Sequence, residues 1–170
     1  MWLGAQFDCS IQFLADPQPQ LNTLKIEPEY LKTSGDAVTN YSEWTIPLGR
    51  RFRALKIWFL IRSYGLEGLR QRIRNHVSWS CELCEHIRGM EGFEIVTEPS
   101  LSLFSFRCPG SDSDQQHLVD ALNDDGRIYI TQGAFDGRKV IRFQVGQFDT
   151  TREDVMMAGD VIADVWRKIA

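Results

Sequence analysis

The sequence predicts an α+β fold for residues 66–170. Along this stretch the patterns follow the order helix, two strands, helix, two strands and helix. Short turns separate the strands of each pair, which favours an antiparallel sheet of four strands, and helices with one apolar face are expected to cover it. The chain has 170 residues, of which 43% are hydrophobic and 25% charged, so it can form one domain or one domain plus a piece of another.

Two stretches precede this domain. Residues 2–14 have the pattern of an apolar strand with no strand before it, so we expect it to belong to a sheet whose other members are missing from the chain. Residues 15–44 are rich in polar residues and breakers, including Asp16-Pro17 and Glu27-Pro28. About thirty residues without regular structure predict a mobile functional segment or disorder.

A helix pattern follows at about residues 50–64, and Gly65 can end it. Its middle, residues 57–61, is apolar all round, so this chain or a partner is expected to bury it. Residues 49–51 are a glycine and two arginines, which at a helix N-terminus suit a phosphate or carboxylate. Solvated arginines at the mouth of a buried helix would explain the same residues.

Residues 66–88 repeat apolar side chains at intervals of three and four, which predicts an amphipathic helix. Cys81 and Cys84 could be half of a metal site or a redox pair. A zinc site needs further ligands at matching spacing, and both cysteines fall on the apolar stripe, where a free thiol packs as a small hydrophobe. We therefore expect both cysteines in the core and no metal site.

The rest of the domain follows from periodicity and capping signals. Strands are predicted over residues 93–98, 101–107, 127–132 and 139–145. Residues 101–107 are apolar on both faces, which predicts a central strand. Ser113 with Gln116, and Thr150 with Glu153, have the spacing of capping boxes for two further helices, the last with an apolar face.

Charge and composition exclude several classes of function. The net charge of −4 gives no reason to expect a nucleic-acid partner, and the longest apolar run is too short to span a membrane. The N-terminus has no signal-peptide pattern, so we expect a cytoplasmic protein. The histidines His76, His86 and His117 are expected mostly on polar helix faces, without a catalytic role.

Three motifs carry a resemblance to a known family. Residues 46–59 contain the pattern I-P-L-G-R-R-F-R-x-L-K-x-W-F, which resembles the matching segment of the group II amino-acid decarboxylases, the aromatic-L-amino-acid decarboxylase family dependent on pyridoxal phosphate (PLP). Residues 2–10 resemble the strand after the family's cofactor lysine, and residues 27–32 resemble its mobile catalytic loop. The match runs in order along the chain but covers only the C-terminal part of the family's length.

The resemblance implies a division into three parts. Residues 1–45 are expected to be the remnant of an incomplete PLP-transferase-type large domain, including the mobile catalytic loop. Residues 46–65 are expected to form a connecting buried helix. Residues 66–170 are expected to form the small C-terminal α+β domain, with a four-stranded antiparallel sheet covered by helices.

The same resemblance implies roles for three residues. Tyr30 matches the catalytic loop tyrosine, a general acid that returns a proton to the substrate carbon after decarboxylation; otherwise it would be a half-buried anchor of the loop. Gly49 matches a position that enters the substrate pocket of the neighbouring subunit in the dimer. Leu48 is a weaker candidate for the same wall. Glycine at position 49 favours an aromatic substrate, and tyrosine at position 30 favours simple decarboxylation over aldehyde formation.

One departure from the family bears on activity. Met1 stands where the family has its Schiff-base lysine, and the other main cofactor ligands of the family lie upstream of the matched region. The resemblance thus implies a C-terminal fragment of a decarboxylase that is inactive and without PLP when alone. It implies a homodimer, or association with the missing large-domain part, around an amino-acid substrate. The alternative is a non-catalytic dimerisation or interaction module left from such an enzyme.

Overall fold

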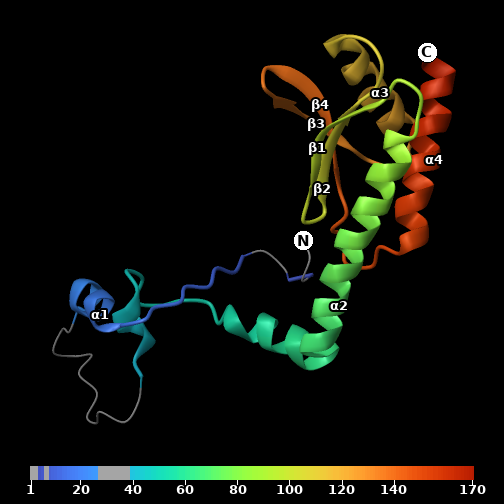
Figure 1. Ribbon diagram of the computed structural model, residues 1–170. Helices are drawn as coiled ribbons and strands as arrows, with labels where there is room; N and C mark the ends of the chain where they lie inside the picture. Colours follow the sequence, from blue (N-terminus) through green and yellow to red (C-terminus); the bar gives the residue numbers. More distant parts are fainter. Residues whose placement is uncertain (1–3, 6–7, 27–38) are drawn as a thin grey trace. The chain divides into compact units, whose positions relative to one another are not determined.

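The computed structural model describes residues 4–5, 8–26 and 39–170 (Figure 1). They fall into two compact units. The larger unit contains residues 60–170 together with residues 4–5, and the smaller contains the described residues from 8 to 59. None of the helices in the described residues has the length and apolar character needed to cross a membrane.

An antiparallel sheet with the strand order β1-β2-β4-β3 forms the centre of the larger unit (Figure 1). Its strands are β1 (Glu94–Ser100), β2 (Leu103–Arg107), β3 (Thr131–Phe135) and β4 (Arg138–Gln144). β2 lies inside the sheet, as its two apolar faces predict. Pro99, which we expected in a turn, continues β1, because an edge strand tolerates the missing N–H.

The helices of this unit are α2 (Ala54–Arg88), α3 (Asp112–Asp125) and α4 (Arg152–Ile169). α2 begins in the smaller unit, and Gly65 interrupts it with φ 67° and ψ 163°, a conformation that suits glycine. The break at Gly65 is where the sequence predicts it. The start at Ala54, however, is four residues later than the predicted start near Arg50.

Capping boxes start α3 and α4, close to where the sequence predicts them. The backbone N–H of Ser111 donates to Asp114 at 2.6 Å, and that of Thr151 donates to Asp154 at 2.9 Å. The predicted boxes at Ser113 and Thr150 are therefore wrong by two residues and by one. Aspartate at the third helical position takes the role that the prediction gave to glutamine and glutamate.

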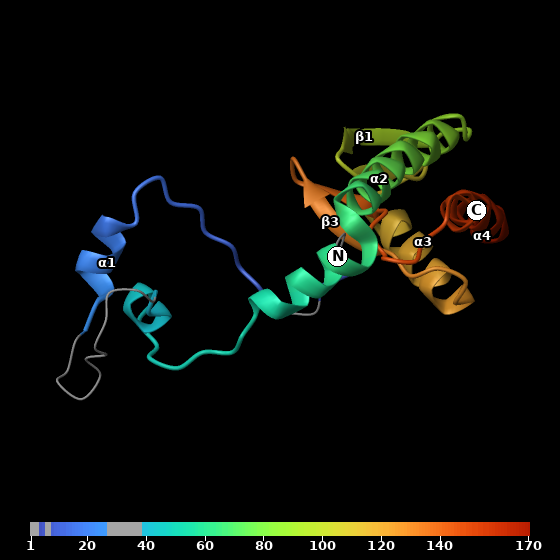
Figure 2. The ribbon, with the colours of Figure 1, turned by 90° about the horizontal axis from the view of Figure 1, so that it is seen from below.

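One face of the sheet and the inner faces of three helices share a single apolar core. Directly paired residues lie on the same face, so Phe104, Phe106, Ile141 and Phe143 point to one side. The same cluster contains residues from each helix: Leu83 and Ile87 of α2, Leu118 and Leu122 of α3, and Ile162 of α4. Figure 2 shows the helices gathered along one side of the sheet, which confirms the predicted α+β sandwich.

The hairpin from β3 to β4 is tighter than the sequence analysis predicts. Gly133, expected in the connection, lies within β3. The turn is Asp136-Gly137, with φ values of 48° and 75°, and it directly joins the pair Phe135 and Arg138. Two central residues with positive φ are typical of the type I′ turn, which an Asp-Gly pair favours. That pair fixes the register of β4.

The smaller unit contains two short helices, α1 (Gln18–Leu24) and the 3₁₀ helix η2 (Tyr41–Trp44). The prediction of no regular structure over residues 15–44 is therefore wrong at these places. The Asp16 side chain accepts from the N–H of Gln18 at 2.9 Å, which starts α1. Residues 8–14 form no strand, although the sequence predicts one, because a strand needs a neighbour with which to pair.

Candidate active-site segment

Two of the three predicted site residues lie in the loop that joins η2 to α2. Leu48 is 57% exposed, and a Cβ atom built on Gly49 would meet no heavy atom within 4 Å. Both positions therefore have open space around them. Tyr30, the predicted proton donor, and Met1, at the position of the cofactor lysine, lie outside the described residues.

Hydrogen bonds from side chains to backbone carbonyls hold this loop at both ends of η2. The Nη2 atom of Arg50 donates to the carbonyl oxygen of Tyr41 at 3.0 Å, and Nε2 of Gln20 in α1 donates to the carbonyl oxygen of Trp44 at 2.8 Å. Asn40 caps η2 by accepting from the N–H of Ser42. The loop carrying Leu48 and Gly49 is thus tied to η2, and η2 to α1.

An ion pair joins two of the motifs on which the family resemblance rests. Nε of Arg53 lies 3.0 Å from Oδ1 of Asp8. This hydrogen bond lowers the pKa of the Asp8 carboxyl below its usual range. Arg53 belongs to the motif of residues 46–59, and Asp8 to the motif of residues 2–10. Neither residue was singled out from the sequence, because their 45-residue separation hides the contact.

Large apolar side chains of the smaller unit are exposed. Ile46 is 84% exposed and Phe52 is 74% exposed, while Trp58 and Phe59 are about half-exposed. The rings of Trp58 and Phe59 pack edge to face, with centroids 5.1 Å apart. From the sequence, we expect the helix around residues 57–61 to be buried by the chain itself or by a partner. The described residues leave these side chains accessible.

The described residues do not form a cradle for PLP. Residues 49–51 would suit a phosphate or carboxylate only at a helix N-terminus, but α2 begins at Ala54, so those N–H groups do not form its first turn. Arg50 is used by the carbonyl of Tyr41. Lys168 is far from this loop in the sequence, and it forms an ion pair with Asp164 at 2.9 Å.

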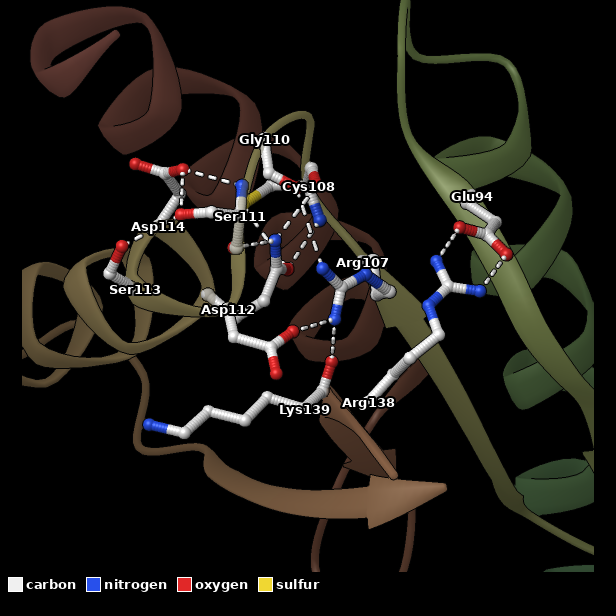
Figure 3. A network of polar contacts seen from close by, with 11 residues as sticks. Glu94, Arg107, Cys108, Gly110, Ser111, Asp112, Ser113, Asp114, Arg138 and Lys139 are labelled. Carbon is white, nitrogen blue, oxygen red and sulfur yellow. Dashed lines mark hydrogen bonds and ion pairs between the residues drawn. The ribbon is translucent and has the colours of Figure 1, made fainter. Parts of the chain in front are cut away.

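A polar network connects the end of β2 with the start of α3 (Figure 3). The buried Arg107 donates from Nη1 to Oδ1 of Asp112 at 2.7 Å and also to the carbonyl oxygen of Lys139 in β4. The hydrogen bond from Arg107 lowers the pKa of the Asp112 carboxyl. Gln115 is buried and bonds the backbone N–H and C=O of Cys108 at 2.8 and 3.0 Å. Since every member is used in bonding the chain to itself, we assign the network a structural role.

His76 is the buried polar residue that the sequence analysis missed. Its ring is fully buried on α2, and neither ring nitrogen has a hydrogen-bond partner among the described residues. Burial, and secondarily the charge of Arg72, lowers the pKa of the imidazole. We expected the histidines mostly on polar faces. The spacing already contained the signal, since His76 lies seven residues from both Leu69 and Leu83, which are buried on the same helix.

The four cysteines all lie in the described residues, and all have free thiols. Cys84 and Cys108 are buried, and burial raises the pKa of Cys84 and raises that of Cys108 to about 11. The prediction of a core position is confirmed for Cys84 but wrong for Cys81, which is exposed because it lies at the margin of the apolar stripe. In the described ranges, no three His, Cys, Asp or Glu side chains gather as metal ligands.

Comparisons with known sequences agree with the motifs. The family model "pyridoxal-dependent decarboxylase conserved domain" matches residues 1–109. Tyrosine decarboxylase 2 of Narcissus pseudonarcissus is 36% identical, with 96% of this chain and 35% of the relative covered. Phenylacetaldehyde synthase of Arabidopsis thaliana is 34% identical with the same coverage, and aromatic-L-amino-acid decarboxylase of Sus scrofa is 37% identical over 85% of this chain and 30% of the relative. The chain thus spans about a third of the length of these relatives.

Solved structures give the same relationship in three dimensions. Oryza sativa TDC with PLP and tryptamine superposes with a TM-score of 0.80 at 29% identity, over 88% of this chain and 33% of that protein. Catharanthus roseus tryptophan decarboxylase in complex with L-tryptophan gives a TM-score of 0.75 at 32% identity, with the same coverage. By its motifs, its family match and its fold, the chain belongs to the pyridoxal-dependent decarboxylase family, within the group that acts on aromatic amino acids.

Proposed function

We propose that this chain forms the C-terminal part of a PLP-dependent decarboxylase for an aromatic L-amino acid. The observation that carries the proposal is its identity of 36% and 37% with tyrosine and aromatic-L-amino-acid decarboxylases along most of the chain. When bound in such an enzyme, PLP supplies the electron sink for loss of carbon dioxide. The chain's own contribution is to the substrate wall and to proton transfer.

Leu48 and Gly49 form the proposed substrate wall, reaching the pocket of a second subunit. A glycine leaves the space that a substrate ring needs, and no atom of the described chain fills the space around Gly49. Leu48 offers an exposed apolar side chain beside it. By the family resemblance, glycine rather than serine at this position favours an aromatic substrate.

Tyr30 is the proposed general acid. Its phenol would donate a proton to the substrate carbon once the carboxyl group has left. The relatives include an aldehyde synthase at 34% identity as well as decarboxylases, so overall similarity does not decide the product. We propose that the residue at position 30 decides it, because by the resemblance tyrosine favours amine formation and phenylalanine favours aldehyde formation.

The chain alone is proposed to be inactive and to bind no PLP, since Met1 replaces the cofactor lysine. We divide it into residues 1–45 from the large domain, a connecting helix over residues 46–65, and the small domain over residues 66–170. We assign it to the cytoplasm, where four free thiols would persist.

A homodimer, or association with the missing large-domain part, is proposed to cover the exposed apolar residues of the segment 46–59. Several large side chains exposed together favour association. The second candidate function is a non-catalytic interaction module. The closed core of residues 66–170 favours it, because that domain does not depend on an active site to fold.

A chimera tests the enzyme proposal. Residues 2–170 of this chain replace the matching C-terminal part of the Narcissus tyrosine decarboxylase, whose own cofactor lysine is kept, and the amine formed from L-tyrosine with added PLP is measured. We expect amine formation by the chimera and none by this chain alone. Tyr30→Phe in the chimera should lower amine formation roughly 100-fold or more, the usual contribution of a general acid.

The controls separate the two candidate functions. A chimera that is folded and shows the visible absorbance of bound PLP, yet forms neither amine nor aldehyde, would reject the enzyme proposal and favour the interaction module. Amine formation by this chain alone would reject its proposed inactivity. Gly49→Ser is the matched test of the wall, and we expect it to raise KM for L-tyrosine more than it lowers kcat.

A further inference from the structure

A hollow of about 180 Å³ lies at the end of the sheet where β2 begins and β4 ends. Its lining includes Leu103, Tyr129, Thr131, Arg142 and Gln144, together with parts of two neighbours. Pairs in the sheet register and alternate positions along β4 lie on one face, so the four strand residues point to the side opposite the helix-covered core. The family model matches residues 1–109, so most of this lining lies beyond it.

The walls of the hollow are held by the core. Asn123 of α3 bonds both backbone groups of Ile130, accepting from its N–H at 2.9 Å and donating to its carbonyl at 3.1 Å. That clamp fixes the backbone between Tyr129 and Thr131. On the other side, the ring of Phe143 is stacked on Phe104, with centroids 5.8 Å apart. The hollow is therefore preformed.

The polar side chains around the hollow are not used within the described chain. Arg142 forms no hydrogen bond or ion pair with the described residues, whereas the other two arginines of the sheet are paired, Arg107 with Asp112 and Arg138 with Glu94. The hydroxyl of Tyr129 is likewise free among these residues, and its side chain is 81% exposed. A guanidinium without a carboxylate is thus available beside an aromatic ring.

The chemistry of the lining selects a class of ligand. A guanidinium matches a carboxylate in a two-point hydrogen-bonded geometry. Leu103 and the ring of Tyr129 offer apolar surface for a flat body. No acidic side chain lines the hollow, so an ammonium group would find no partner there. Since a cavity of about 150 Å³ can hold benzene, this one has room for a ring with a short carboxylate arm.

We propose that this hollow binds a small aryl monocarboxylate, with its carboxylate on Arg142 and its ring against Tyr129 and Leu103. The site is separate from the loop of Leu48 and Gly49. It does not depend on decarboxylase activity, so it can be tested on the chain alone.

Titration of the full chain with phenylacetate, followed by amide chemical shifts in NMR spectra, tests the proposal. We expect saturable shifts at Thr131, Arg142 and Gln144 in the millimolar range. Arg142→Gln should weaken binding roughly tenfold, because a hydrogen bond to a charged group is lost. Arg142→Lys should retain part of the affinity. Arg138→Gln is the matched control, an arginine of the same strand outside the hollow, and should leave binding unchanged.

Two further probes give the outcomes that would overturn the proposal. Phenylacetamide lacks the charge and phenethylamine reverses it, so neither should bind with comparable affinity. Equal binding of phenylacetamide, an unchanged affinity in Arg142→Gln, or no shifts at these amides would each refute the site. If Arg142→Gln fails to fold, Tyr129→Ala at the exposed rim replaces it and should weaken binding severalfold.

Discussion

Large apolar side chains are mostly buried in residues 66–170, whereas several are exposed in residues 39–59. In the first region, phenylalanines and aliphatic side chains from three helices and the sheet close into one buried core. In the second, Ile46, Phe52 and Trp58 are exposed on a loop and a helix. An apolar sequence pattern predicts that side chains are buried. The topology of the chain decides which element covers them. The C-terminal region contains its own sheet, and we propose that a partner covers the segment of residues 39–59.

The largest expected effect is the loss of a ring from the closed core. Phe106 is fully buried between the sheet and the helices. Phe106→Ala should lower the free energy of unfolding by about 3–5 kcal/mol, the usual cost of such a cavity. Urea unfolding followed by circular dichroism measures it. If the variant is as stable as the parent, residues 66–170 do not have the core described above.

The second largest effect is a difference in stability between two ion pairs, one with a buried arginine and one with an exposed arginine. Arg107 is buried and bonds both Asp112 and the carbonyl of Lys139. Arg107→Ala should cost about 1–3 kcal/mol, because the hydrogen bonds of a charged and buried side chain are lost. Arg138→Ala, which removes the exposed pair with Glu94, should cost at most about 1 kcal/mol. Equal losses in the same urea assay would mean that the network of Figure 3 is no more than a surface contact.

Local sequence signals predicted most of the larger unit. The central position of β2 followed from its two apolar faces, and the break in α2 followed from Gly65. Errors were one or two residues at the capping boxes, as at Ser111 and Ser113, but larger at β3, which was predicted over residues 127–132 and is observed at Thr131–Phe135. The sequence analysis did not place the turn at Asp136-Gly137, although this dipeptide favours the backbone conformation that a tight hairpin requires.

Long-range contacts could not be predicted in this way. The pairing of Asp8 with Arg53, and the clamp of Asn123 on Ile130, depend on backbone placement far from each residue in sequence. The open space around Gly49 is likewise a property of the surroundings and not of the motif. The site residue Tyr30 lies outside the described residues, so its role stays a prediction.

A smaller effect concerns the unpartnered imidazole in α2. Burial lowers the pKa of His76 below the usual histidine value of 6.5, so the unfolded chain binds a proton more readily than the folded chain. Stability is therefore fully present above about pH 6.5 and decreases as the pH falls below it.

Variants at two histidines test that pH dependence in urea unfolding at several pH values. His76→Leu should flatten the curve below pH 6.5 without loss of stability near neutrality, since neither ring nitrogen has a partner to lose. His117→Gln, at an exposed position of α3, should keep the parent's curve. A parent whose stability is constant on acidification would refute the effect of buried His76.

The smallest effect on stability is expected where the apolar side chains are already exposed. Replacing Trp58 and Phe59 by serine should change the free energy of unfolding of residues 66–170 by less than about 0.5 kcal/mol, because neither ring belongs to that core. The same change should reduce self-association of the chain, measured by light scattering at micromolar concentrations. Burying a large apolar side chain is worth roughly 1.5–3 kcal/mol, so two rings can decide whether two copies stay together.

Light scattering on the parent and the double variant tests whether a second copy covers the segment of residues 39–59. Association in the parent and none in the double variant would mean that the segment of residues 39–59 finds its missing cover in a second copy. A parent that stays monomeric would mean that a homodimer does not bury these rings, and the proposed large-domain part would be the remaining candidate. A large loss of stability in the double variant would contradict the comparison itself, because exposed rings that stabilise the C-terminal core must be buried in it.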